Sequence, residues 1–548
     1  MPSTPKTSPS VSPAIVLAVL MLVGLAIRLW HITDVPVWID ETYSFWVANT
    51  HPYPDRLEAV IRPMQWFEAQ QLAWQPLQWE RLLAILKQNV HMPLYYLLLN
   101  PWLGGVGNSL WGLRAFSALW SVLMIPVGFC FGRSLATEPE SRYACGFWAA
   151  ALLAFSPNMI YYAQEGRMYT LAMFGVLAAT TFLFRALHSA RPVRWVVAYT
   201  TAALAALFSH YMVVFILAAH ALVVLWRGRS QWRVWLGCGL VLAVAAAAWL
   251  PVYQAQQQFV GQEDHFASSL VSWTRYPAGL IWPQLLSIAG NAEITRILLI
   301  PLTGLILIEG LWRVWQGQPR HRTMAALIGL PAALQIVYDL ITHQHTSVIF
   351  RYNLLWMPLL LVWLGSILGW ILTRPGNLSN RPRGLQPVLG VGLMLLLLVL
   401  AILTVQPGTA FWGHGHKKRM DQVATYLRAH LQPGDLIVAN GDLGVPNILT
   451  IQLAKSHPQQ PMLYWVKTYR GQPVHLPTGE MLKPYRRVWF FQYRGNSERG
   501  LDVIKDHLAT FYPHVTIGPD PTGILKLYEH QGGGLGAVPS PSHPGQGR

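Results

Sequence analysis

Charge is scarce in this chain. Asp, Glu, Lys and Arg together make up 12% of its 548 residues, whereas hydrophobic residues make up 53%. An ordinary soluble domain carries roughly 25% charged residues. The composition therefore excludes a soluble globular protein and predicts a polytopic α-helical membrane protein.

Cysteine and acidic residues are also few. The three cysteines, Cys130, Cys145 and Cys238, all fall within apolar runs, which excludes a disulfide framework in the exposed parts. The 24 Asp and Glu residues stand against 40 Lys and Arg residues, a formal net charge of +16. Much of this basic excess lies in short loops between apolar runs, so it indicates membrane topology and no nucleic-acid partner.

Apolar runs long enough to cross a bilayer, about 17 to 25 residues, recur along the chain. They begin near Pro13, Leu110, Ala144, Met168, Trp195, Tyr211, Val234, Ile297, Thr323, Tyr352 and Pro387. Short basic loops follow every second run, at residues 133–142, 185–194, 227–233, 313–322 and 374–383. Because cytoplasmic loops carry the excess of Lys and Arg, we expect about eleven spans and a cytoplasmic N-terminus. The first run lacks a small-residue cleavage site and is expected to be retained.

The same reasoning predicts the domains. Residues 1–405 form the transmembrane domain of an integral, multi-pass protein of the plasma (inner) membrane. Its first outer loop, residues 31–108, is expected to hold interfacial helices: a Trp-rich helical stretch at 55–88 and a short juxtamembrane or re-entrant helix at 93–107. A small insertion without membrane contact is the alternative for the Trp-rich stretch.

The C-terminal part has a different pattern. Residues 411–530 alternate strand-like and helical runs, with a turn at Pro433-Gly434-Asp435, which predicts a small extracytoplasmic α/β domain. The strand-like runs are 436–439, 462–466, 488–493, 514–517 and 524–528. The Gly, Pro and Ser-rich tail at 531–548 is expected to be disordered.

Asp40 and Glu41 are the most informative acidic residues. They follow the first apolar run directly, at the expected outer edge of the bilayer. Carboxylates are costly to keep there, so a pair of them is typical of chemistry at the membrane surface. The alternative is a helix N-terminus capped by these acids, although capping alone does not explain two carboxylates after Trp38-Ile39.

Further polar residues fall on the same predicted face. They are His91, Tyr162, Glu165, Arg167, Tyr169, His210, His343, His345, Arg351 and Tyr352, together with Arg114 at the start of the second span. Each also has a structural interpretation. The arginines can extend to lipid headgroups, the tyrosines can anchor the helices in the interface, and Glu165 can pair with Arg167. The two loop histidines can be simply solvated.

Four motifs in order resemble the GT-C membrane glycosyltransferases. They are Asp40-Glu41, His91-Met92-Pro93-Leu94-Tyr95-Tyr96, Arg114, and Tyr162-Ala163-Gln164-Glu165-Gly166-Arg167-Met168-Tyr169. Within that superfamily the chain looks similar to the protein O-mannosyltransferase and aminoarabinose transferase group, glycosyltransferase family 39. Met92 stands where this group commonly has proline, and Gly166 stands where it commonly has alanine.

The resemblance implies sugar transfer with inversion from a polyprenyl-phosphate carrier to an outer lipid, glycan or protein acceptor. Asp40 would be the general base, with Glu41 or Glu165 positioning substrate or tuning that base. Arg167, Arg351 and the histidines would bind the lipid phosphate. No resident cofactor is implied, and if a divalent metal ion takes part, Asp40 and Glu165 would be its ligands.

Two other functions fit a polytopic chain. A lipid or glycolipid transporter or flippase usually places its polar residues near the bilayer midplane, often in repeated halves. Here the acids gather on one face and no internal repeat is visible. An anchor for the C-terminal domain is the second alternative. Asp40→Asn distinguishes the three functions.

Overall fold

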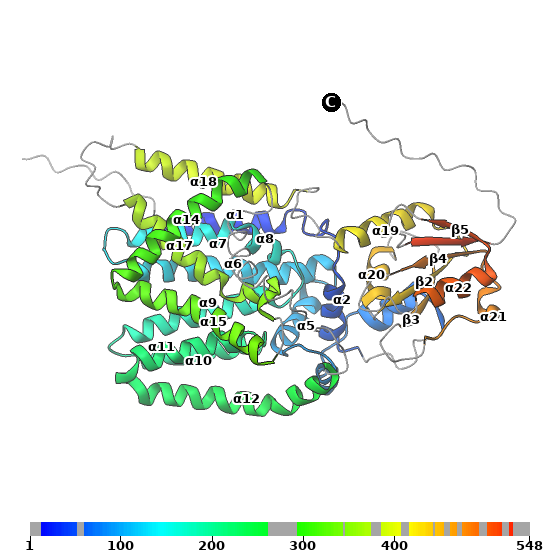
Figure 1. The fold of residues 1–548 in the computed structure, drawn as a ribbon, viewed down its shortest axis with the longest axis horizontal. Helices are drawn as coiled ribbons and strands as arrows, with labels where there is room; N and C mark the ends of the chain where they lie inside the picture. Colours follow the sequence, from blue (N-terminus) through cyan, green and yellow to red (C-terminus); the bar gives the residue numbers. More distant parts are fainter. Residues whose placement is uncertain are drawn as a thin grey trace, which may run out of the picture. The chain divides into compact units, whose positions relative to one another are not determined.

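The computed structural model describes most of the chain. The described residues are 12–51, 60–260, 293–342, 346–373, 385–406, 416–441, 444–453, 461–467, 474–492, 501–517 and 525–529. The chain divides into two compact units, drawn in Figure 1. We call Met1–Pro36, Tyr43–Pro52 and Trp74–Gly415 the helical unit, and Val37–Thr42, Tyr53–Ala73 and His416–Arg548 the sheet unit.

The helical unit is built almost wholly of α-helices. Its α-helices are α1 Pro13–Leu29, α4 Trp79–Lys87, α5 Leu94–Val106, α6 Leu110–Leu135, α7 Arg142–Phe155, α8 Pro157–Ala163, α9 Tyr169–Leu187, α10 Val193–Leu207, α11 Val213–Arg227, α12 Trp232–Val260, α14 Glu293–Trp315, α15 Pro319–Thr342, α16 Phe350–Asn353, α17 Met357–Thr373 and α18 Leu385–Thr404. Short 3-10 turns lie at Arg229–Gln231, Thr346–Val348 and Leu354–Trp356. Helix α2, Ile39–Ala48, begins in the sheet unit and ends in the helical unit.

Several of these helices are suited to a membrane. Among the described residues, five helices are long and apolar enough to cross a bilayer, and six are if the bent pair α7–α8 is one span. The bend of 52° falls at Ser156-Pro157, where proline lacks the backbone N–H that a continuous helix needs. In the same described ranges, four further apolar helices have 10–17 residues. The structure therefore agrees with a membrane protein, and the number of eleven spans and their orientation stay predictions.

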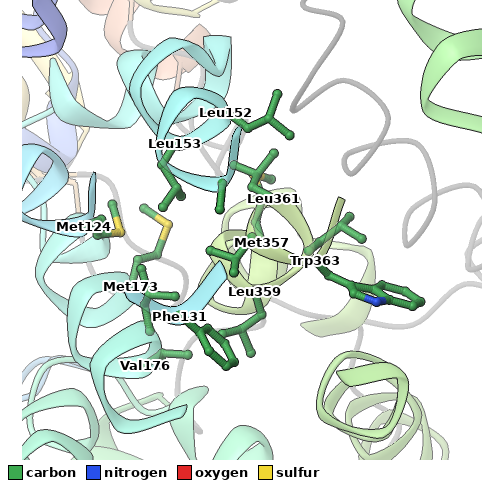
Figure 2. Packing of buried hydrophobic residues seen from close by; sticks show 14 of the residues in the cluster. Met124, Phe131, Leu152, Leu153, Met173, Val176, Met357, Leu359, Leu361 and Trp363 are labelled. Carbon is green, nitrogen blue, oxygen red and sulfur yellow. The ribbon is translucent and has the colours of Figure 1, made fainter. Parts of the chain in front are cut away.

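Helices α6, α7, α9 and α17 pack around one hydrophobic core. Gly365 and Gly369 of α17 face α7 so closely that a Cβ atom at either position would lie 2.4–2.5 Å from α7 backbone atoms. Small residues four positions apart allow the two backbones to approach closely. In lipid, where no hydrophobic driving force acts between helices, the resulting van der Waals packing stabilises their association. Figure 2 shows apolar side chains of this core, including Leu153 of α7, Met173 of α9 and Leu361 of α17.

The sheet unit contains a six-stranded mixed sheet. Its strands are β1 Ile61–Pro63, β2 Leu436–Gly441, β3 Met462–Lys467, β4 Arg487–Phe491, β5 His514–Ile517 and β6 Leu525–Glu529, in the order β1-β3-β2-β4-β6-β5. Strands β3, β2 and β4 are parallel, and the other pairs are antiparallel. Its helical segments are α3 Met64–Phe67, the π-helical turn Glu68–Leu72, α19 His416–His430, α20 Gly444–Leu453, α21 Gly479–Leu482 and α22 Leu501–Phe511.

The C-terminal strands lie where the alternating pattern predicts them. Gly434 has φ +85°, a left-handed conformation that suits glycine, at the predicted turn into β2. The domain limits and the extracytoplasmic placement stay predictions. The tail at 531–548 lies outside the described residues.

The helical prediction for residues 55–88 is wrong at two places. Ile61–Pro63 is a strand that pairs with β3, so that Ile61 lies opposite Tyr464. The proline is tolerated because β1 lies at the edge of the described sheet. One side of an edge strand forms no ladder hydrogen bonds, so no N–H group is needed there. Residues 74–78 are not helical, since Pro76 cannot continue a helix, and α4 begins only at Trp79. The short helix predicted at 93–107 is present as α5.

Candidate active site

Arg167 is the centre of a buried polar cluster in the helical unit. It is 3% exposed and lies in the turn between α8 and α9. Its Nη2 lies 2.8 Å from His91 Nε2, and its Nη1 donates to Ser44 Oγ at 3.4 Å. The backbone of the turn is fixed as well, because the Ser117 hydroxyl donates to the Arg167 carbonyl at 3.2 Å. Segments far apart in sequence therefore meet around one guanidinium.

Aromatic rings connect this cluster to two other turns. The Tyr169 ring lies 5.6 Å from the His210 ring, and the His210 ring lies 5.7 Å from that of Tyr352. The Arg351 guanidinium is 5.7 Å from the Tyr352 ring, and Tyr162 is 5.5 Å from Tyr169. The structure thus brings together Tyr162, Arg167, Tyr169, His91, His210, Arg351 and Tyr352, which the sequence assigns to one face.

Both histidines of the cluster are neutral. Burial lowers the pKa of His91 well below its usual value, and the charge of nearby Arg167 lowers it further. Burial likewise lowers the pKa of His210 to about 3, with Arg167 and Arg351 adding to the effect. Arg167 has only donors, so His91 accepts at Nε2 and carries its proton at Nδ1. The positive charge of the cluster therefore resides on the arginines.

The Nδ1 proton of His91 is a buried hydrogen-bond donor. His91 Nδ1 is buried and has no hydrogen-bond partner within the part of the chain that the structure describes. The backbone of this residue is held in place by Gln256 of α12, whose Nε2 donates to the carbonyls of Leu86 and His91 at 2.8 and 3.1 Å. A fixed, buried donor beside a cation is suited to bind an anionic oxygen atom.

Asp40 and Glu41 lie in the first turn of α2. Glu41 is buried, and its Oε2 accepts from the Trp38 N–H at 2.9 Å, which caps the helix. Asp40 is half-buried and precedes Ser44 by one helical turn. The capping role considered for this acidic pair therefore belongs to Glu41. The catalytic roles of Asp40 and Glu41 stay predictions.

Arg114 does not extend to headgroups, contrary to one alternative. It is fully buried and donates to the carbonyls of Ile32, Val35 and Pro36 at 2.7, 2.8 and 3.3 Å. It therefore shapes the segment that leads into α2. Gly166, the departure from alanine, is packed against Leu113, whose Cγ would lie 2.3 Å from an added Cβ.

The sequence interpretation missed Asp339 of α15. Its buried carboxylate accepts from Thr346 N and Oγ1 at 3.0 and 2.7 Å and from Ser347 N at 2.7 Å. Asn353 then donates to the Ser347 carbonyl at 2.6 Å, so the turn that precedes Arg351 is fixed from both sides. A lone acid near the end of an apolar run was the available signal.

The remaining predicted residues are Glu165, His343 and His345. Glu165 is buried, and its carbonyl accepts from the Arg167 N–H at 2.8 Å. His343 and His345 lie outside the described residues. Within the described ranges, no three His, Cys, Asp or Glu side chains gather as a multidentate metal site requires. A metal ion held by Asp40 and Glu165 stays a prediction.

Comparison with known proteins gives one clear result. No family model and no curated protein sequence matches the chain. The structure is similar to ArnT from Cupriavidus metallidurans in the apo state, with TM-score 0.54 and 14% identity over 94% of this chain and 98% of that chain. It is also similar to ArnT bound to undecaprenyl phosphate, with TM-score 0.50 and 15% identity over 94% and 97% of the two chains. The chain therefore shares its fold with ArnT, and this agrees with the membrane fold that the resemblance of its motifs implies.

Proposed function

We propose that the chain transfers a sugar from a polyprenyl-phosphate carrier to an extracytoplasmic lipid, glycan or protein acceptor, with inversion. The observation that carries the proposal is the buried cluster in which Arg167 contacts a neutral His91, with Arg351 close enough to act electrostatically on the same histidine. A phosphate leaving group needs this kind of fixed positive environment. The neighbour ArnT, in a structure with undecaprenyl phosphate, supports the lipid class of the donor.

The proposed reaction is a single displacement. The oxygen atom of an acceptor hydroxyl attacks the anomeric carbon of the donor sugar. Asp40 accepts the proton of that hydroxyl as the new bond forms. The bond from that carbon to the phosphate oxygen breaks, and its electron pair stays on the polyprenyl phosphate. Attack from the face opposite the leaving group inverts the anomeric configuration. Asp40 is a half-buried carboxylate in the first turn of α2, and a carboxylate is suited to accept the proton of a hydroxyl, which supports its choice as base.

The leaving phosphate is bound by the arginine cluster. Arg167 and Arg351 neutralise the charge that develops on the phosphate oxygens, and His91 donates its Nδ1 proton in a hydrogen bond. A neutral histidine is useful here because it can donate at one nitrogen while it accepts from Arg167 at the other. Tyr162, Tyr169, His210 and Tyr352 surround the site and position the donor.

The test is sugar transfer by membranes that contain the full chain. Undecaprenyl-phosphate hexoses and pentoses serve as donor probes, and transfer to membrane acceptors is measured for wild type and Asp40→Asn. We expect the variant to lose about 10³-fold in rate, as for loss of a general base. Asp34→Asn, an exposed acid that lies 2.6 Å from His31 Nδ1, is the matched control and should keep its rate.

Other outcomes separate the alternatives. Full transfer by Asp40→Asn would contradict the catalytic role. Loss of movement of a fluorescent undecaprenyl phosphate across vesicles, with transfer intact, would support a flippase instead. The anomeric configuration of the product, determined by NMR, tests inversion.

A further inference from the structure

A second polar site lies at the other end of the same helices. A cavity of about 570 Å³ is lined by Arg133 at the end of α6, Arg142 at the start of α7, Arg185 near the end of α9 and Arg320 at the start of α15. From Tyr169, in the candidate active site, α9 runs 16 residues to Arg185, a rise of about 24 Å at 1.5 Å per residue. That distance is close to the thickness of a bilayer core, so this cavity is separate from the active site.

The cavity has a strong excess of positive charge. Its lining contains these four arginines and no Asp or Glu. Throughout the described part of the chain, none of the four arginines forms an ion pair with a carboxylate. Arg142 is close enough to Arg320 for their like charges to repel each other. Such an arrangement costs free energy until an anion enters.

Two of the four arginines have defined contacts within the protein. The Arg185 guanidinium lies 4.9 Å from the ring centre of Trp195, a cation–π contact, and an Arg320 Nη1 donates to the carbonyl of Ala136. His188 also lines the cavity, and its Nδ1 donates to the Phe184 carbonyl at 2.8 Å. This contact leaves its Nε2 for another partner.

Topology alone does not account for this convergence. The rule for cytoplasmic loops requires only that Lys and Arg be frequent in them. Arg191 precedes α10 and Arg194 lies in its first turn, yet neither lines the cavity, and the Arg194 guanidinium lies 4.7 Å from the ring centre of Trp195. The four cavity arginines come from four helices and face one space. Convergence of planar guanidinium groups is typical of phosphate recognition.

We propose that this cavity binds the phosphate group of an anionic ligand, at the side of the membrane opposite the candidate active site. Two sources supply such a group: the headgroup of an anionic phospholipid and a soluble phosphate compound. Arginine forks contact the phosphate oxygens in pairs, and Trp195 and Phe184 form the apolar wall. This phosphate site does not depend on the sugar transfer proposed above, and the experiment that tests it measures ligand binding alone.

The experiment uses the purified full-length protein in neutral maltoside detergent at constant ionic strength. Thermal stabilisation is titrated with phosphatidylglycerol, with phosphatidylcholine as the neutral lipid, and separately with inorganic phosphate and pyrophosphate. The test variant is Arg133→Gln/Arg185→Gln. The matched control is Arg191→Gln/Arg194→Gln, which also removes two positive charges, one just before α10 and one in its first turn.

We expect the test variant to bind the effective probe about tenfold or more weakly than wild type, since each lost charge-assisted hydrogen bond changes affinity by roughly that factor. The control should bind as wild type does. Stabilisation by phosphatidylglycerol alone identifies a lipid headgroup, and stabilisation by pyrophosphate or phosphate alone identifies a soluble ligand. Both results support the site.

Two results would overturn the proposal. In the first, no anionic probe stabilises the wild type more than phosphatidylcholine does. In the second, the test and control variants lose affinity equally, which would mean that only overall charge matters. If the double variant does not fold, the single variants Arg133→Gln and Arg194→Gln provide the same comparison.

Discussion

Arg114 and Arg167 are both buried in the helical unit, yet their surroundings differ in kind. Arg114 donates to three backbone carbonyls, whereas Arg167 contacts the side chains of His91 and Ser44. Carbonyls of a folded backbone are permanent partners, and three hydrogen bonds of Arg114 go to them. A side-chain partner such as His91 can contact Arg167 with one atom and bind a ligand with another. We therefore predict that Arg114 stabilises the framework, whereas Arg167 has the reaction role proposed for it above.

The largest expected effect is on stability at Arg114. Arg114→Met removes the donor from three buried carbonyls, so we expect the free energy of unfolding to fall by about 4 kcal/mol, at roughly 1 to 3 kcal/mol for each orphaned acceptor. The melting temperature of the purified protein and the yield of folded protein measure this loss. If Arg114→Met keeps its stability and loses transfer, the residue belongs to the site and the comparison fails.

Arg167→Lys should show the opposite behaviour. Lysine keeps the charge but cannot contact His91 and bind a phosphate with a planar fork, so we expect about 100-fold slower transfer with little change in melting temperature. The rate per folded molecule is compared with that of Arg114→Lys, which should lose stability but keep its rate. A large loss of stability in Arg167→Lys would make this arginine a framework residue too.

Some of this site follows directly from the sequence. The order of short polar motifs between apolar runs predicts that four residues share the outer face of the membrane. Each of them lies near the end of an apolar run that is expected on the outer side: His91, Arg167, His210 and Arg351. The fold follows from the same runs, since each expected start falls at or near the start of a helix.

Other features depend on tertiary contacts that no local pattern records. Ser44 looks like any residue of a helix until Arg167 is placed against it. Strand β1 exists because β3 offers a backbone edge to Ile61, a partner about 400 residues away in the chain. Gln256 and Asp339 hold the backbone of other segments of the chain, Gln256 at the His91 carbonyl and Asp339 at the Thr346 N–H. Such residues become visible when the helices are packed.

Asp339 extends the comparison to a positioning residue. Asp339→Asn weakens the two backbone hydrogen bonds that fix Thr346 and Ser347, so we expect about 2 kcal/mol less stability and a smaller decrease in transfer than Arg167→Lys gives. The KM for the lipid donor should rise more than kcat falls, because the turn that presents Arg351 is loosened. An unchanged KM with a collapsed kcat would place Asp339 in the chemistry itself.

The smallest expected effect is the pH dependence that comes from His210. Its pKa is lowered to about 3 in the folded chain, against about 6.5 for an exposed histidine. Between these values the unfolded chain binds the additional proton, so stability is complete above about pH 6.5 and decreases as the pH falls toward 3, by at most about 1.4 kcal/mol per pH unit. His210→Gln, which cannot titrate, should lose less melting temperature than wild type between pH 6.5 and 5. Equal losses would mean that His210 becomes protonated within the folded protein. The cluster would then hold a third cation beside Arg167 and Arg351.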